Sequence, residues 1–246
     1  MTNNNITTFI SDFRTSGIIN WMQSKYDVVM VWLSGSSALG ITDEESDYDL
    51  GVLVADNITF SKSVKSPFLY NYKKENKKQV QCIYNSFEDI FAEPNSEQLA
   101  IYRYLGWAQF RIIEKEHIIY INPKYSQLVE QLIANRLEIS LNAINSFLQY
   151  VKFGVDIVHE PFQVGVVKWG KMLSHLCWCA DILSNTSHDK ERLLRIKRAL
   201  PQDLNREDRK YAFNKIKFVQ QYLENPHKVD LNLSFLTQIN ERDERS

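Results

Sequence analysis

The sequence predicts an α+β protein, in which a small mixed sheet with flanking helices is followed by an all-helical C-terminal part. Two β-branched runs, at residues 28–34 and 48–55, predict buried strands. After Pro123, apolar residues recur at intervals of three and four, which is typical of amphipathic helices. This change of pattern divides the chain into a first domain, residues 1–123, and a helical domain, residues 124–246.

The other elements follow from the same periodicities. Apolar spacing predicts a helix over residues 6–24 that is broken near Gly17, and the lysine-rich KENKK joins two short strands as a hairpin. Helices at 87–93 and 96–110 then lead to a last strand at 116–122. The helices expected after it cover 125–155, 162–184, 189–200 and 206–223, with breaks at Pro161, Pro201 and Pro226.

Composition places the chain among soluble proteins of the cytoplasm. Of its 246 residues, 44% are hydrophobic and 24% charged, and no apolar run approaches the roughly 18 residues that a membrane span needs. The N-terminal residues lack the basic-then-apolar order of a secretion signal. Three cysteines without a C-x-x-C pair argue against a disulfide framework or a zinc site, so Cys177 and Cys179 are interpreted as packing residues.

The charge distribution leaves one alternative open. The formal net charge is −1, so no global field attracts nucleic acid. Basic residues nevertheless outnumber acidic ones at 62–78 and at 188–217. Solvated helix and turn surfaces explain both segments more simply than a nucleic-acid surface does.

The most specific pattern lies between the two β-branched runs, where Gly35-Ser36 is followed by Asp47 and Asp49. In a strand, side chains at i and i+2 share a face, so both carboxylates point the same way. They repel each other unless a cation lies between them. A strand that ends in Gly-Ser before a short helix exposes N–H groups that bind phosphate, and paired carboxylates bind Mg²⁺. The pattern indicates a nucleoside triphosphate site with one or two metal ions.

This ordered combination resembles the signature of the DNA polymerase β-type nucleotidyltransferase superfamily, in its small-molecule and uncharacterised bacterial and phage branches. The resemblance covers residues 25–90 well and the remainder loosely, and it includes Gly40. It implies the nucleotidyltransferase-type sheet and two catalytic carboxylates, Asp47 and Asp49, that hold Mg²⁺ or Mn²⁺. It also implies that ATP, the simplest nucleotide substrate, is held by a set of small residues: Gly35, Ser36 and Ser46.

One position departs from the family pattern. The family's third carboxylate lies in an apolar-acid-apolar triplet of a later strand, and the best-placed triplet here is Val80-Gln81-Cys82. An amide at Gln81 can hold a water or a hydroxyl, but it cannot accept a proton as a general base. Either turnover is weak or absent, or the base comes from elsewhere; the weaker candidates are Glu88, Asp89, His159 and Glu160.

The helical half offers a further correspondence. Lys171 and His175 lie at i and i+4 on one predicted helix face. The pair is similar to a Lys-x-x-x-His helix of the predicted-nucleotidyltransferase branch, which has an arginine where this chain has Trp178. It implies a nucleotide-binding role for both residues. A snorkelling lysine and a hydrogen-bonded core histidine explain the same spacing equally well.

The leading hypothesis is therefore Mg²⁺-dependent transfer of a nucleoside monophosphate, most simply AMP from ATP, onto an unidentified acceptor. The acceptor could be a small molecule, an RNA or a protein, and its pocket is expected in the helical domain. One alternative is a nucleotide-binding protein of this fold with lost catalysis, acting as a regulatory or antitoxin-like partner. Another is an RNA-directed nucleotidyltransferase that uses the basic segments. The oligomeric state is not predicted.

Overall fold

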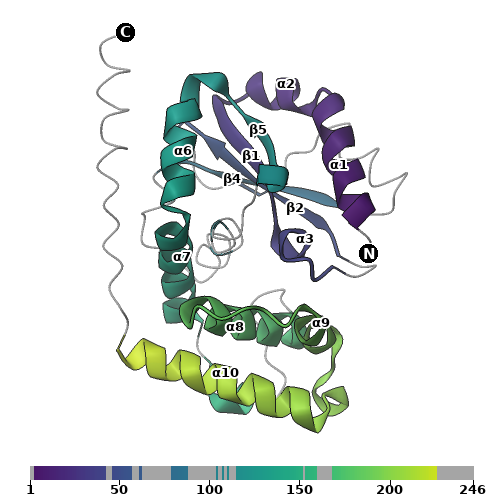
Figure 1. The fold of residues 1–246 in the computed structure, drawn as a ribbon, viewed down its shortest axis with the longest axis vertical. Helices are drawn as coiled ribbons and strands as arrows, with labels where there is room; N and C mark the ends of the chain where they lie inside the picture. Colours follow the sequence, from purple (N-terminus) through teal and green to yellow (C-terminus); the bar gives the residue numbers. More distant parts are fainter. Residues whose placement is uncertain are drawn as a thin grey trace.

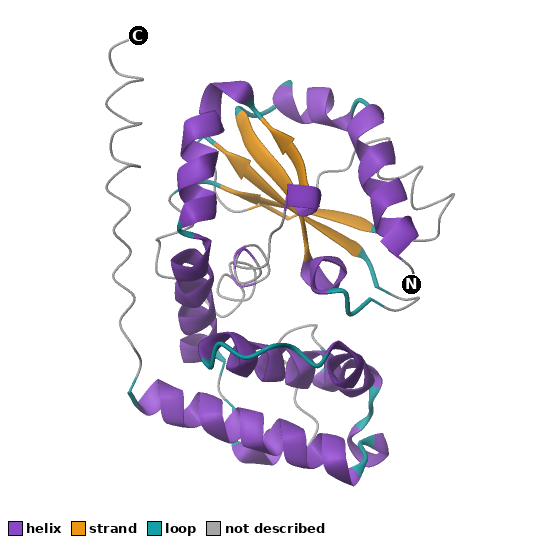
Figure 2. Ribbon diagram, in the orientation of Figure 1, coloured by secondary structure: helices purple, strands orange, loops and turns teal. Residues whose placement is uncertain are grey.

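The computed structural model confirms the predicted fold class: a mixed sheet with flanking helices is followed by a helical region (Figures 1 and 2). The structure describes residues 3–42, 46–56, 61–62, 79–87, 104, 107, 110, 115–151, 153–159 and 168–225. The sheet has five strands in the order β3-β4-β2-β1-β5, and only the β2–β4 pair among them is parallel. The strands are β1 Val28–Ser34, β2 Tyr48–Val54, β3 Ser61–Lys62, β4 Val80–Asn85 and β5 Ile118–Ile121.

The helices agree with the predicted order. Those before and within the sheet are α1 Asn3–Thr15, α2 Ile18–Gln23 and α3 Gly35–Leu39. Those after it are α6 Ser126–Ala134, α7 Arg136–Tyr150, α8 Trp169–Leu183, α9 Lys190–Arg198 and α10 Arg206–Glu224. The expected hairpin strand at 68–73, most of the helices expected at 87–93 and 96–110, and residues 162–167 lie outside the described residues.

Two helix breaks have identifiable causes. Gly17 separates α1 from α2 with φ of 76°, a left-handed conformation that glycine adopts without penalty. The helix expected over 125–155 is wrong in one respect, because it is divided at Asn135. There the Asn135 side chain donates a 2.8 Å hydrogen bond to the Gln131 carbonyl, which also accepts from the Asn135 backbone. Such side-chain competition for a backbone carbonyl favours helix ends over helix interiors.

The two faces of the sheet join different hydrophobic clusters. From β2, Tyr48 and Leu50 pack toward α1, where Phe9 stacks on Tyr48 with ring centroids 4.0 Å apart. Leu53 belongs instead to the larger cluster, which contains buried residues of α7 and α8. Since side chains alternate along a strand, Asp49 shares the face of Leu53. The carboxylate-bearing end of β2 therefore faces the helical region.

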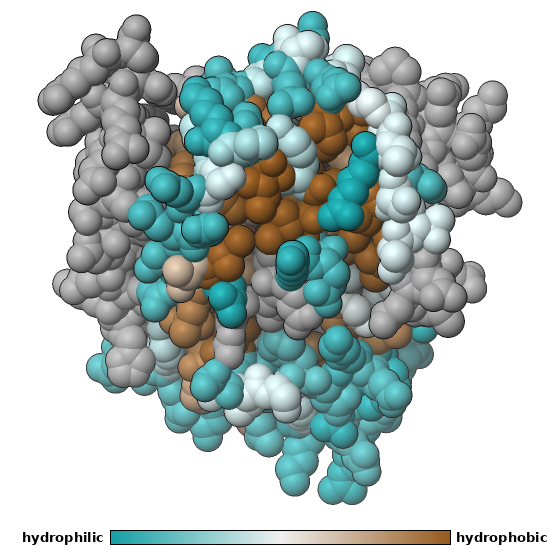
Figure 3. All heavy atoms as spheres, turned by 45° about the horizontal axis from the view of Figure 1, so that its top comes forward, coloured by the Kyte–Doolittle hydropathy of each residue, from teal (hydrophilic) through white to brown (hydrophobic). Residues whose placement is uncertain are grey.

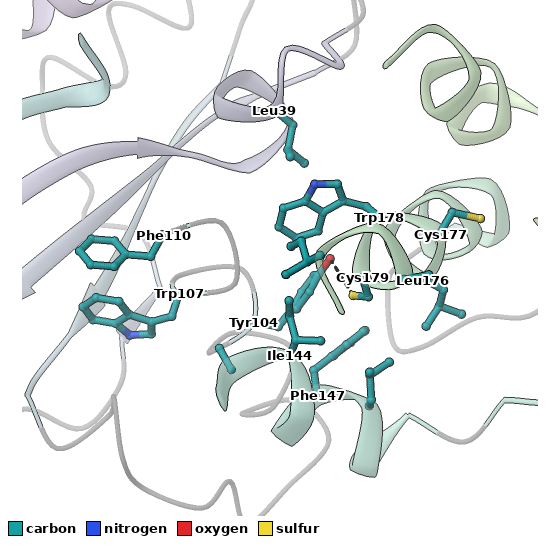
Figure 4. Packing of buried hydrophobic residues seen from close by; sticks show 14 of the residues in the cluster. Leu39, Tyr104, Trp107, Phe110, Ile144, Phe147, Leu176, Cys177, Trp178 and Cys179 are labelled. Atoms are coloured by element: carbon teal, nitrogen blue, oxygen red, sulfur yellow. Dashed lines mark hydrogen bonds between the residues drawn. The ribbon is translucent and has the colours of Figure 1, made fainter. Parts of the chain in front are cut away.

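The larger cluster is built on aromatic rings from both halves of the chain (Figure 4). Trp32 of β1 lies 5.1 Å from Trp107 between ring centroids, and Tyr104 stacks on Phe147 of α7 at 4.2 Å. A Cβ atom on Gly51 would lie 2.1 Å from the Trp32 ring, so only glycine fits beneath it. One core thus extends from the sheet into the helices, while the division into domains at residues 123 and 124 stays a prediction.

Two buried aspartates of the helical region form ion pairs with basic residues of the same region. Asp208, nearly fully buried, accepts two hydrogen bonds from Arg195 at 3.0 and 3.1 Å. Asp181, equally buried, pairs with Lys215 of α10 at 2.5 Å. Hydrophilic residues cover this region at the bottom of Figure 3. Among the described helices, none is long and apolar enough to cross a membrane.

The cysteines lie in the core, as predicted for two of them. Cys82, Cys177 and Cys179 are all buried and free of disulfides. Burial raises the pKa of the Cys179 thiol to about 12, which keeps it protonated. Cys179 lies 3.6 Å from the hydroxyl of Tyr104, a contact drawn in Figure 4. These thiols therefore serve packing.

Candidate functional site

Gly35 and Asp49 approach each other so closely that they form a single feature. Gly35 follows the last residue of β1 and begins α3, with φ of 66°. A Cβ atom there would lie 2.0 Å from Asp49 Oδ2 and 2.8 Å from Asp49 Cβ. The cross-strand register explains the proximity, because Ser34 of β1 is paired with Asp49 of β2. The predicted Gly-Ser turn and the predicted acidic strand are thus in direct contact.

Helix α3 also holds the backbone of the other aspartate. The Ser37 hydroxyl, buried in α3, donates to the Asp47 carbonyl at 3.4 Å. Gly40 ends the helix in the left-handed conformation with φ of 69°, and the N–H of Ile41 returns to the Ser36 carbonyl at 3.0 Å. This ending turns the chain back toward β2. Ser36, Asp47 and Asp49 are each half-buried, so the site borders on solvent.

Gln81 occupies the place predicted for it beside the two aspartates. In the parallel β2–β4 pair it lies in register with Asp49, and its Nε2 donates to Asp47 Oδ2 at 3.2 Å. A carboxylate can only accept, so Gln81 turns its N–H groups rather than its oxygen toward Asp47. Gln81 thus lies beside the aspartates as expected, while its standing in place of a third catalytic acid stays a prediction. The group there is a neutral hydrogen-bond donor.

Helix α9 brings a cation from the helical region to the same segment. Lys197 Nζ donates to the Ser46 hydroxyl at 2.9 Å and to the Ile41 carbonyl at 3.3 Å. Ser46 immediately precedes Asp47 in the sequence, so the Lys197 ammonium contacts the residue next to the first carboxylate. At the other end of α9, Lys190 Nζ would lie 3.1 Å from a Cβ atom on Gly40. Helix α9 therefore contacts the segment between α3 and β2 at both ends.

The position of α9 is fixed by backbone packing. A Cβ atom on Gly170 of α8 would lie 2.7 to 2.8 Å from the carbonyl oxygens of Ile196, Lys197 and Ala199. One turn further, the Ser174 hydroxyl donates to the Leu193 carbonyl at 3.0 Å. Glycine at position 170 thus lets α8 touch the last turn of α9. The backbone that carries the Lys197 side chain has little freedom to shift.

Lys171 and His175 lie in different surroundings although they share a face of α8. Lys171 is exposed, whereas His175 is buried beside Tyr104, with ring centroids 5.4 Å apart. Burial, together with the charges of Lys171 and Lys197, lowers the pKa of His175 to about 3. The imidazole is therefore neutral at physiological pH. His175 is therefore a core histidine, while the nucleotide-binding role expected for Lys171 and His175 stays a prediction.

The weaker candidates for a general base do not gain support. His159 lies at the end of a short turn, where Arg209 of α10 contacts its Nδ1 at 3.3 Å. Glu88, Asp89 and Glu160 lie outside the described residues. Within the described part of the chain, no three or more His, Cys, Asp or Glu side chains cluster as a metal site would. The acidic residues that the structure describes at this site are Asp47 and Asp49.

Sequence reasoning missed three residues of this arrangement: Ser37, Lys190 and Lys197. Ser37 stood in the sequence next to a predicted phosphate-binding residue, and its spacing from Ser36 gave no sign that it faces inward. Both lysines belong to the basic segment 188–217, whose simplest interpretation is a solvated surface. No sequence pattern indicates that Lys197 contacts Ser46, because the two residues are 151 positions apart.

The buried imidazole generates a pH prediction. The folded protein keeps His175 neutral down to a pKa of about 3, whereas the unfolded chain binds a proton below the ordinary pKa of 6.5. The free energy of unfolding should therefore be fully retained above pH 6.5 and fall by about 1.4 kcal/mol per pH unit below it. Urea unfolding of the parent and of His175→Asn at pH 7.5 and 5.0 measures this, and the variant should lose that part of the slope. An imidazole NMR signal of His175 that titrates near pH 6.5 would contradict the assignment.

Comparison with known protein families finds a match over the part of the chain that carries the candidate site. Residues 16–121 match the family described as the nucleotidyltransferase domain. The matched segment contains the Gly35–Asp49 contact and Gln81, and it ends with the last residue of β5. None of the curated proteins compared with the chain matches it. Residues 16–121 are therefore a nucleotidyltransferase domain, in agreement with the polymerase β-type superfamily that the Gly-Ser and Asp-x-Asp pattern resembles.

Proposed function

We propose that the chain is a Mg²⁺- or Mn²⁺-dependent nucleotidyltransferase that moves a nucleoside monophosphate, most simply AMP from ATP, onto an acceptor and releases pyrophosphate. The observation that carries this proposal is the approach of Gly35 to Asp49, where a Cβ atom would lie 2.0 Å from the carboxylate oxygen. A backbone without a side chain beside a carboxylate lets phosphate oxygens and a cation be held at one place. Neither feature alone would support nucleotide transfer.

The donor set fits a magnesium ion. Mg²⁺ prefers oxygen ligands and is commonly held by one or two carboxylates together with substrate phosphates and waters. Asp47 and Asp49 supply two half-buried carboxylates, and a third protein acid is not required for binding the ion. When bound, the ion would neutralise phosphate charge and orient the triphosphate for in-line displacement.

The chain's own residues supply the remaining functions. Gly35 and Ser36 would bind phosphate oxygens through their backbone and hydroxyl groups. Ser46 and Lys197 would hold the segment that carries Asp47, with the ammonium close enough to attract an anionic substrate. Transfer then consists mainly of positioning and charge stabilisation, which are the dominant contributions in phosphoryl chemistry.

Two observations bear on the alternatives. The hydrogen bond from Gln81 to Asp47 favours, as a second candidate, a nucleotide-binding protein that has lost turnover. An RNA-directed enzyme is less favoured, because many cations of the segment 188–217 bind within the protein. Those with internal partners are Arg192, Arg195, Lys197, Arg209 and Lys215.

The proposal is tested by removing the carboxylates. Asp47→Asn and Asp49→Asn should each weaken Mg²⁺-dependent ATP binding at least tenfold, because each removes a charged metal ligand. Calorimetry with ATP in Mg²⁺ and in EDTA measures the effect, with exposed Asp12→Asn of α1 as the control. Release of labelled pyrophosphate from each of the four nucleoside triphosphates in a cell extract then separates turnover from binding alone. Equal ATP affinity of the parent protein in Mg²⁺ and EDTA would sink the proposal.

The glycine contact is tested by a matched pair of alanine variants. Gly35→Ala and Gly40→Ala both place a side chain at a φ near 70°, so they share the same backbone strain. Only the first collides with Asp49, whereas the second meets the flexible end of Lys190. Thermal melting should show a larger loss of stability for Gly35→Ala, and nucleotide affinity, measured at a temperature where both variants are folded, should also fall far more for Gly35→Ala. Comparable affinities for the two variants would show that Gly35 does not shape the site.

The contribution of α9 is tested on its two end lysines. Lys197→Met removes an ammonium that bonds to Ser46, and roughly a tenfold weaker affinity for Mg²⁺-ATP is expected from the loss of a charged hydrogen bond. Lys190→Met makes the same charge change on the same helix without touching Ser46, and should have a smaller effect. Lys197→Arg should recover part of the affinity. If both methionine variants weaken binding equally, the effect is one of net charge and not of the Ser46 contact.

A further inference from the structure

We propose that the acceptor attacks with an oxygen that is already ionised at neutral pH, a phosphate or carboxylate oxyanion, and not with a neutral hydroxyl. The inference depends on the proposed nucleotidyl transfer and names the chemical class of its acceptor. It starts from the group that the fold places beside Asp47. That group is the side-chain amide of Gln81, held by a 3.2 Å hydrogen bond.

A hydroxyl nucleophile must lose its proton during attack, and a positioned side chain such as a histidine or a carboxylate accepts it. Gln81 has no basic atom, and its N–H groups are directed at Asp47. Its position is set by the pairing of the parallel strands β2 and β4, in which Gln81 is in register with Asp49. The position in register with Asp49 is therefore filled by a hydrogen-bond donor and not by a group that could accept a proton.

The helical side of the site does not supply a proton acceptor either, in the residues described there. His175 is the imidazole near Lys171 and Lys197, and its neutral form is so strongly favoured that it binds a proton poorly at pH 7. The two lysines are cations and accept no proton. An acceptor that arrives ionised requires none of these groups to act as a base.

Charge points the same way. An acid at position 81 would repel an anionic acceptor as it approached the α-phosphate, whereas the amide does not. Lys197, whose ammonium group donates to the Ser46 hydroxyl, makes the helical side of the site positive. An anionic acceptor would be attracted there, and a neutral alcohol would gain little from the same field.

The step balances without proton transfer. An oxygen lone pair of the acceptor forms a bond to the α-phosphorus of the nucleotide, and the bond from that phosphorus to the α,β-bridging oxygen breaks. Pyrophosphate leaves with the electron pair. A carboxylate acceptor yields an acyl-nucleotide mixed anhydride, and a phosphate acceptor yields a phosphoanhydride. No general base takes part in either case.

The linkage in the product tests the inference. The full-length protein is incubated with Mg²⁺, α-labelled ATP and a small-molecule fraction of cell extract, and the labelled product is isolated. Cleavage by neutral hydroxylamine identifies an acyl linkage, and cleavage by a nucleotide pyrophosphatase to AMP and a phosphate monoester identifies a phosphoanhydride; either supports the inference. A phosphodiester to a hydroxyl overturns it while leaving nucleotidyl transfer intact. Mg²⁺-ATP binding without any labelled product overturns it too, and failure to bind Mg²⁺-ATP refutes the proposed function itself.

The variant Gln81→Glu gives a second test in the same product assay, because an oxyanion acceptor and a hydroxyl acceptor predict rate changes in opposite directions. With an oxyanion acceptor, the added charge should lower kcat/KM for the acceptor roughly tenfold, and the parent's kcat/KM should stay level between pH 7 and 9. With a hydroxyl acceptor, the new carboxylate should raise the rate, and the parent's kcat/KM should climb with pH. Gln81→Leu, which removes the amide without adding charge, controls for lost packing. A faster Gln81→Glu enzyme would overturn the inference.

Discussion

The contact between the end of β1 and the start of β2 governs this structure. Antiparallel pairing of Ser34 with Asp49 brings the turn at the end of β1 against the Asp49 carboxylate. The approach is possible because Gly35 has no side chain. Every other element of the site is arranged around that pair. Helix α3 returns through Gly40 and Ser37 to hold Asp47, and β4 adds Gln81 from the next strand.

The helical region completes the site in a different way. It contributes no acid to the described part of the site, but it supplies Lys197 from α9 and the buried His175 from α8. The shared aromatic core keeps the two regions in a fixed relation, because Trp32 of the sheet and Phe147 of α7 belong to one hydrophobic cluster. A nucleotide bound at the aspartates would therefore lie near the ammonium group of Lys197.

Local patterns made much of this predictable. The strand at 28–34 appears with the predicted bounds, and alternation along β2 and β4 was enough to place Gln81 beside the aspartates. The break at Asn135 could not be read from apolar spacing, since it depends on a side chain that competes for a carbonyl. Lys197 was hidden for another reason: a contact between residues far apart in sequence leaves no trace in the periodicity of either segment. The burial of His175 likewise depends on Tyr104, which another part of the chain contributes.

The seat of α9 on Gly170 has an evolutionary consequence. The three atoms nearest to a Cβ atom placed on Gly170 are main-chain carbonyl oxygens, so a side chain there would displace the end of α9 that carries Lys197. Position 170, on another helix and exposing no functional group, therefore tolerates no side chain without a shift of α9. Selection that maintains the acidic segment should therefore also maintain Gly170 of α8. A protein that lost this glycine would have to reposition α9 before Lys197 could reach Ser46 again.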